Sequence, residues 1–280
     1  MRRELTIQEI QTVSLEILKR VADLCEELQL RYYLVFGTLI GAIRHHGYIP
    51  WDDDVDIMMP RPDHDKLMEH LSEHPLPGLT VFNRRTCRDY PYMLTRISDD
   101  GYILEMENEE SVGMGIFIDV YPFDGLGNTR EEAVPFGLKG DYLSSLCYQA
   151  TRKHFAMETT TSVFRKIIKF PVFLISRMIG KDFFQNRLEL LAGTRDYETS
   201  EYVGCVTWLT WGEKEMFLRK WFDESILVPF EKYEFRVPKC YDEVLRHEYG
   251  DYMQLPPEKD RIGHHYYKAF SKGRDDHEKR

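Results

Sequence analysis

Four aspartates crowd into five consecutive positions, Asp52 to Asp54 and Asp56. Carboxylates this close repel each other strongly unless a cation or solvent separates their charges. Because side chains alternate along an extended strand, Asp54 and Asp56 share one face there, while Val55 and Ile57 turn to the core. Mg²⁺ takes one or two carboxylates and completes its shell with water and phosphate. We therefore predict that Asp54 and Asp56 bind Mg²⁺, with Mn²⁺ as the alternative; the competing interpretation is a solvated acidic turn.

A fifth carboxylate, Asp119, lies inside an apolar stretch from Gly115 to Tyr121 that is typical of a buried strand. Burying a charge is unfavourable unless the group is paired or binds a metal. Asp119 is therefore a third candidate ligand, or the base that accepts a proton from a substrate; an edge-facing, solvated Asp119 is the alternative.

Upstream of the acids, Phe36-Gly37-Thr38 ends a short β-branched and aromatic run and leads into a helical pattern. Free backbone N–H groups at such a strand-to-helix turn suit a phosphate. Gly37 and Thr38 are therefore candidate substrate-binding residues.

The spacing of Asp52, Asp54 and Asp56 also resembles the first three ligands of a calcium-binding EF-hand loop. That loop needs a glycine next and a glutamate at its twelfth position. Here Ile57 follows and Asp63 stands at the twelfth position, so the sequence excludes an EF-hand.

Hydrophobic periodicity predicts the elements that position these residues. Thr6 and Glu9 form a capping-box pattern before an amphipathic helix that reaches Leu28, and another helix surrounds His64 to Leu71. A further helix is expected over Thr38 to Arg44. The predicted strands are Tyr32 to Phe36, Val55 to Met58, Leu79 to Phe82, Tyr92 to Ile97, Tyr102 to Met106 and Ile116 to Val120.

From about Arg130 onward the pattern is mainly helical, with interruptions expected at Pro171, Gly180 and Gly193. We therefore predict an α+β protein, with a mixed sheet flanked by helices and an α-rich C-terminal half. Residues 1–128 would form the catalytic core with its N-terminal helix, and residues 129–280 a mainly helical region that completes the active site and the acceptor side.

Composition narrows the class of protein. A net charge of −10 argues against nucleic-acid binding, which normally needs a basic patch. Five scattered cysteines without metal-site or redox spacing are typical of reduced thiols. Because no apolar stretch follows the first charges, we expect a cytoplasmic protein without a signal peptide.

The stretch from Phe36 to Ile57 (FGTLIGAIRHHGYIPWDDDVDI) resembles the LicD family of phosphocholine transferases, which is related to fukutin and fukutin-related protein. The resemblance continues through FIDVYPFDG, from Phe117 to Gly125, and returns in YGDYMQLPP, from Tyr249 to Pro257, with His264 and His265. It implies a nucleotidyltransferase-like fold.

The resemblance also implies a reaction. A phospho-alcohol, usually phosphocholine, would pass from a CDP-activated donor such as CDP-choline to a hydroxyl of a lipid-linked glycan precursor of teichoic acid or lipopolysaccharide, with release of CMP. Two alternatives stay open: an NTP-dependent nucleotidyltransferase, which would release pyrophosphate, and a non-catalytic binding member of the fold.

For such a transfer we assign further roles. Arg44 is the candidate clamp for the donor diphosphate, because its planar guanidinium matches phosphate oxygens. The alternative is that Arg44 is a cation at a helix C-terminus that interacts with the helix dipole. Asp53 orients the turn or is solvated. His264 and His265 are candidate substrate-binding residues on the resemblance alone.

One segment suggests contact with a membrane. Between Arg152 and Arg187 the chain carries eight basic residues and two acids, interleaved with large apolar side chains. This composition fits a helix that lies on an anionic surface, such as the inner membrane leaflet. The alternative is a core-packed helix pair, which Pro171 favours because proline breaks a continuous helix.

Overall fold

The computed structural model of the 280-residue chain describes residues 3–106, 108–155, 163–208, 212–261 and 267–272. Its first helix, α1 (Ile7–Glu27), begins as predicted with a capping box, in which Thr6 Oγ1 accepts from the Glu9 N–H and the Glu9 carboxylate accepts from the Thr6 N–H. Its apolar stripe is buried against the sheet.

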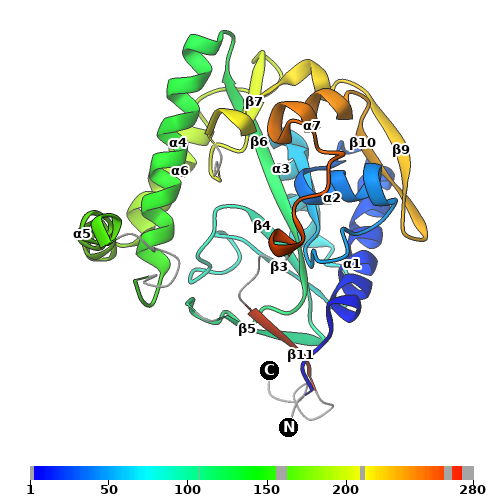
Figure 1. Ribbon diagram of the computed structural model, residues 1–280, viewed down its shortest axis with the longest axis horizontal. Helices are drawn as coiled ribbons and strands as arrows, with labels where there is room; N and C mark the ends of the chain where they lie inside the picture. The colour runs from blue at the N-terminus through cyan, green and yellow to red at the C-terminus, as the bar shows by residue number, and fades with distance from the viewer. Residues whose placement is uncertain (1–2, 107, 156–162, 209–211, 262–266, 273–280) are drawn as a thin grey trace.

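A mixed sheet forms the centre of the molecule (Figure 1). Its strands run in the order β1-β2-β6-β4-β3, and β7 and β8 extend it from β6. Strands β2 and β6 are parallel, whereas the other pairs are antiparallel. The strands are β1 (Tyr33–Leu34), β2 (Asp56–Pro60), β3 (Leu79–Phe82), β4 (Thr95–Asp99), β6 (Phe117–Gly127), β7 (Tyr202–Gly204) and β8 (Phe217–Leu218).

Strands β2 and β6 lie in the core, and all their residues are buried. A strand buried on both faces carries a nearly continuous apolar run, which makes any acid within it conspicuous. Helix α3 (Arg61–Glu73) follows β2 directly and packs on β2 and β6. The predicted strand from Ile116 to Val120 is thus only the first part of a longer one.

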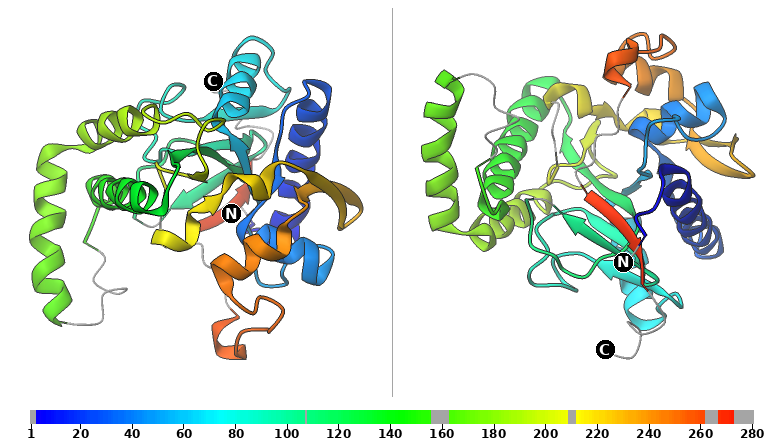
Figure 2. Two further views of the ribbon diagram at one scale, coloured as in Figure 1. Left: turned by 90° about the horizontal axis from the view of Figure 1, so that it is seen from above. Right: turned by 60° about the horizontal axis from the view of Figure 1, so that its bottom comes forward.

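The predicted α+β class is confirmed, and the part of the chain after residue 128 is richer in helix than in strand. Helices α4 (Arg130–Thr151), α5 (Val163–Ile179) and α6 (Lys181–Ala192) follow one another on one side of the sheet (Figures 1 and 2). The expected breaks at Gly180 and Gly193 are present, but the break at Pro171 was wrong, because α5 continues through it.

Several strands after residue 128 escaped the sequence analysis. Besides β7 and β8, these are the hairpin β9 (Ser225–Phe230) and β10 (Tyr233–Pro238), and β11 (Tyr267–Ser271), which pairs with β5 (Tyr102–Met106). Most of these strands are short or lie at a surface, so they lack the apolar run that marks a core strand. The C-terminal region therefore adds strands to the N-terminal sheets and is not purely helical.

The remaining helical elements are two short helices that follow β1, a helix that packs on them, and three 3₁₀ turns. Helix α7 (Tyr241–Tyr249) packs on α2 (Phe36–Ile40), which continues into one turn of π-helix, η1 (Gly41–His45). Short 3₁₀ turns are η2 (Gly212–Glu215), η3 (Arg219–Phe222) and η4 (Glu258–Asp260). Within the part of the chain that the structure describes, no helix is long and apolar enough to cross a bilayer.

Candidate functional site

Asp56 and Asp119 occupy matching positions on the parallel strands β2 and β6. The N–H of Asp119 donates to the Val55 carbonyl at 2.8 Å, which fixes this register. Neighbouring strands lie about 4.8 Å apart, so paired residues share a face and stand side by side. The structure thus brings together two acids that lie far apart in the sequence.

Asp56 is buried in a strongly negative environment. Its removal from water raises the pKa of its carboxyl well above the usual value, and the charges of Asp54, Asp119 and Asp52 raise it further, while Arg96 lowers it. Its Oδ1 atom has no hydrogen-bond partner among the described residues. Asp54 lies just before β2. Of the neighbouring charges, Asp54 raises the pKa of Asp56 the most. The three acids singled out from the sequence therefore form one cluster.

Arg96 is a residue of this site that the sequence analysis missed. It lies opposite Asp119 on β4, and its Nε donates to Asp119 Oδ1 at 2.7 Å. Its guanidinium carbon lies 4.2 Å from the ring centroid of Tyr92 and 4.0 Å from that of Phe117. Burial alone would lower the pKa of Arg96, but the nearby charge of Asp119 has the larger effect and the pKa is raised. An arginine inside the predicted strand from Tyr92 to Ile97 was the available signal.

The turn from Phe36 to Thr38 positions the start of β2. Thr38 Oγ1 accepts from the Asp56 N–H at 2.9 Å, and Phe36 has a left-handed backbone with φ of 53°. A Cβ on Gly37 would lie 2.7 Å from Asp52 Oδ2, so only glycine lets this carboxylate approach the backbone. Non-glycine residues with positive φ are strained and concentrate at functional sites. The predicted helix from Thr38 to Arg44 is present as α2 and η1.

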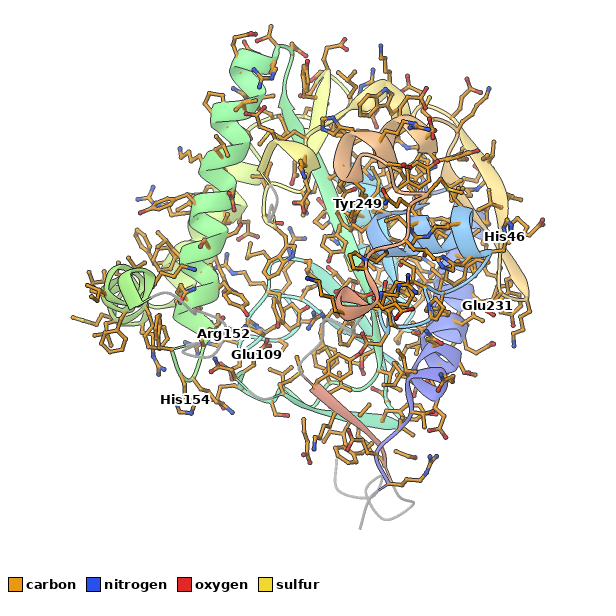
Figure 3. All side chains as sticks on the ribbon, viewed as in Figure 1. His46, Glu109, Arg152, His154, Glu231 and Tyr249 are labelled. Carbon is orange, nitrogen blue, oxygen red and sulfur yellow. The ribbon has the colours of Figure 1, made fainter. Side chains whose placement is uncertain are left out.

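A second close approach fixes the loop that leads to the acids. A Cβ on Gly47 would lie 2.2 Å from Glu231 Oε1, and this oxygen accepts from the Tyr48 N–H at 3.1 Å. The Glu231 N–H in turn donates to the His46 carbonyl at 2.8 Å (His46 and Glu231 in Figure 3). The turn of the β9–β10 hairpin thereby holds the loop. On its other side, Gln11 of α1 donates to the Asp52 carbonyl at 2.7 Å.

Three tyrosines from distant parts of the chain surround the acids. Burial raises the pKa of Tyr121 well above its usual range, and so do Asp56, Asp119 and Asp54. The pKa of Tyr249 on α7 (Figure 3) is raised by burial, by Glu248 and by Asp56. The pKa of Tyr267 is raised by burial and by Asp53 and Asp54. Of these three, only Tyr121 lies close in sequence to a predicted acid, two residues after Asp119, so the other two could not be assigned to the site from spacing.

The remaining predicted site residues have different surroundings. Asp53 is hydrogen-bonded to Tyr267, which ties the acidic loop to β11. Arg44 lies at the end of η1, and its Nη1 donates to the Tyr252 carbonyl at 2.5 Å. Its role as a clamp for a diphosphate stays a prediction. His264 and His265 lie outside the described residues.

The donor set fits a hard cation. Carboxylate oxygens are the ligands that Mg²⁺ and Mn²⁺ prefer, and the orphaned Oδ1 of Asp56 is the kind of atom that a cation would satisfy. The mutual repulsion that raises the pKa of Asp56 is what a positive ion relieves. Among the described residues no three His, Cys, Asp or Glu side chains are already arranged to hold an ion. Asp54, Asp56 and Asp119 would therefore have to draw together around it.

Comparisons with known proteins identify similar sequences. Residues 29–155 match the family described as LicD/FKTN/FKRP, nucleotidyltransferase domain. The chain is 31% identical over 279 residues to the lipopolysaccharide cholinephosphotransferase LicD of Haemophilus influenzae, an alignment that covers 96% of this chain and 99% of that protein. It is also 30% identical over 108 residues to an uncharacterized protein of Rickettsia prowazekii, which covers 38% of this chain and 39% of that protein.

Proposed function

Because the chain belongs to the LicD family, we propose that it transfers phosphocholine, or a similar phospho-alcohol, from a CDP-activated donor to a hydroxyl of a lipopolysaccharide or teichoic acid precursor. The observation on which the proposal depends is the acid cluster, in which Asp56 and Asp119 are paired across β2 and β6 and Asp54 lies just before β2. It is supported by the similarity over nearly the full length of a lipopolysaccharide cholinephosphotransferase.

In the proposed reaction the acceptor oxygen attacks the phosphorus that carries choline, and the bond from that phosphorus to the CMP oxygen breaks. The acceptor loses its proton, and CMP leaves with the electron pair of the broken bond. Positioning and electrostatic stabilisation supply most of the acceleration of a phosphoryl transfer. A bound Mg²⁺ would neutralise charge on the diphosphate and the leaving group.

The chain's own residues have separate tasks in this proposal. Asp54 and Asp56 would hold the cation, and Asp119 would either share it or accept the acceptor's proton. Arg96 restrains Asp119 through the Nε bond and holds its carboxylate in one orientation. Tyr121, Tyr249 and Tyr267 lie near the acids. An aromatic face that is open to a bound choline group would attract its quaternary ammonium by about 0.5–2 kcal/mol.

The experiment is product analysis. The purified protein is incubated with Mg²⁺, a lipopolysaccharide acceptor and one of CDP-choline, CDP-ribitol or CDP-glycerol, and CMP release is followed. The proposal expects acceptor-dependent CMP from one of these donors, none in EDTA and none from Asp56→Asn.

The same assay separates the alternatives. Pyrophosphate release from an NTP, without CMP from any CDP-alcohol, would identify a nucleotidyltransferase instead. Binding of a CDP-alcohol with no turnover under any of these conditions would identify a binding protein.

A further inference from the structure

The loop that carries the first acids has no regular structure of its own. Residues 46–55 connect η1 to β2, and the chain forms bends and a turn there but neither a helix nor a strand. Ordering such a segment costs conformational entropy, which contacts with other elements must offset. The position of Asp54 therefore depends on the groups that hold this loop.

One support of the loop is the turn of the β9–β10 hairpin. Glu231 Oε1 accepts from the Tyr48 N–H at 3.1 Å, and the Glu231 N–H donates to the His46 carbonyl at 2.8 Å (Figure 3). Between these two points lies Gly47. A Cβ on Gly47 would lie 2.2 Å from Oε1, and the three nearest atoms that it would meet all belong to Glu231. The carboxylate thus occupies space that only a glycine leaves open.

The backbone at this contact is strained. Glu231 is the first of two turn residues between Phe230 and Tyr233, and its φ of 54° lies in the left-handed region. Two-residue hairpin turns favour glycine, asparagine or aspartate where φ is positive. On the loop side, His46 has a φ of 55°. Because such strain concentrates at functional sites, a glutamate at a position that favours glycine indicates a role for its side chain beyond forming the turn.

The hairpin is a firm support because it is itself attached to α1. Arg236 of β10 pairs with Glu26 of α1 through two hydrogen bonds. The side chain of Tyr48 joins the same two elements: its hydroxyl forms a hydrogen bond of 2.8 Å with Ser14 of α1, and its ring packs against Phe230 with centroids 4.9 Å apart. The loop is therefore held between α1 and the hairpin, shortly before the acids.

We propose that Glu231 is a positioning residue of the cation site. Its carboxylate holds the loop at Tyr48, and this contact keeps Asp54 beside Asp56. The inference rests on the cation of the proposed function and assigns Glu231 no direct contact with that ion. Without the carboxylate the loop has more conformations, so cation binding must also offset the entropy of ordering it. Removing groups that orient the ligands of a metal typically lowers its affinity about 10–100-fold.

The test is a calorimetric titration of Mg²⁺ into the full chain, without donor or acceptor. Glu231→Gly removes the carboxylate and places glycine where a positive φ is favourable. We expect the Kd for Mg²⁺ to rise about tenfold, while the melting temperature in EDTA changes little. Glu234→Ala removes an acid from an exposed position of β10; it is the control and should leave the Kd unchanged.

The conservative variant separates positioning from charge. Glu231→Gln keeps an oxygen that can accept from the Tyr48 N–H but has no charge. It should therefore restore Mg²⁺ binding to the wild-type Kd. A Kd that rises as much in Glu231→Gln as in Glu231→Gly would mean that the charge of Glu231 acts on the cation, and would overturn the positioning role.

Gly47→Ala tests the same contact from the side of the loop. The added methyl group has to displace the Glu231 carboxylate, so the Kd should rise about as much as in Glu231→Gly. In the double variant the nearest atoms that the methyl group would meet are absent. The two effects should therefore not add, and the Kd of the double variant should match that of Glu231→Gly.

The titration distinguishes failure of this inference from failure of the proposed function. Wild-type binding with an unchanged Kd in Glu231→Gly would overturn the inference and leave the proposed function in place. The absence of Mg²⁺ binding by the wild type would overturn the inference together with the cation of the proposed function.

Discussion

Arg96 and Asp119 stand directly opposite each other on the antiparallel strands β4 and β6, joined by a hydrogen bond of 2.7 Å between Nε and Oδ1. Both are buried, and two aromatic rings enclose the guanidinium. The pair places one positive charge next to the acid cluster and limits the repulsion that Asp119 exerts on Asp56. The remaining negative charge of Asp54 and Asp56 is left for a cation.

Removing one partner of this pair should cost more than removing both. Arg96→Gln leaves Asp119 buried without its cation, and breaking a buried pair in this way typically lowers the free energy of unfolding by about 3–5 kcal/mol. In the double variant with Asp119→Asn the loss should be smaller than the sum of the two single losses. Urea denaturation of the four proteins measures the coupling. Additive losses would show that the pair is not energetically coupled.

Asp56→Asn should stabilise the metal-free protein while it abolishes activity. The amide removes a charge whose burial and neighbours raise the pKa of Asp56, but it also removes an anionic ligand. We expect kcat to fall at least about 10³-fold and the melting temperature in EDTA to rise. Asp54→Asn should also abolish turnover. Glu224→Gln, at an exposed site paired with Lys239, is the control and should change neither quantity.

The stability of Asp56→Asn also distinguishes metal binding from a purely structural role. Added Mg²⁺ should raise the melting temperature of the wild type but not that of the variant. Near-wild-type turnover by Asp54→Asn or Asp56→Asn at saturating Mg²⁺ would exclude that residue as an essential ligand.

Arg44→Lys should weaken donor binding, because a single ammonium group cannot reproduce a bidentate fork. We expect KM for the CDP-alcohol to rise about tenfold with a smaller change in kcat. Lys220→Arg, at an exposed position of the turn η3, serves as a control for the exchange of these two side chains. An unchanged KM together with a lower melting temperature would assign Arg44 only to the contact with the Tyr252 carbonyl.

Stability should fall as pH rises through the titration of Glu248. Burial and the nearby Glu215 raise the pKa of this carboxyl to about 8, while Tyr249 and Lys214 oppose the shift. The folded-state pKa lies above the ordinary value of 4.5, so the folded protein favours protonated Glu248. The contribution of Glu248 to the free energy of unfolding is therefore fully present below about pH 4.5 and is lost as the pH rises to about 8. Within that window the slope is at most about 1.4 kcal/mol per pH unit.

Glu248→Gln should flatten this part of the profile, because the amide stays neutral throughout. Glu243→Gln, at an exposed position earlier on α7, should leave it unchanged. Chemical denaturation at pH 5, 6, 7 and 8 provides the comparison. A wild-type profile that rises over this range, or one that the Gln variant does not flatten, would mean that Glu248 is ionised in the folded protein.

The sequence by itself determined the residues of the acid cluster and the class of the fold. Charge crowding at Asp54 and Asp56 and an acid inside an apolar strand at Asp119 are local signals, since side-chain alternation and the unfavourable burial of charge act over a few residues. The capping box at Thr6 and the helical spacing of apolar residues after it are also local signals, and they predicted α1.

Only the tertiary structure decided which groups surround the acids. Arg96 meets Asp119 because β4 and β6 pair in one register, and a shift of one residue would turn the two side chains to opposite faces. Tyr249 and Tyr267 reach the cluster from α7 and β11, through packing between segments remote in the sequence. The outward orientation of α5 was also hidden, because the periodicity of a helix shows that it has an apolar side but not what covers that side. Packing on α4 and α6 and the hydrogen bond of Arg177 determine which side of α5 faces the protein, and so which side stays exposed.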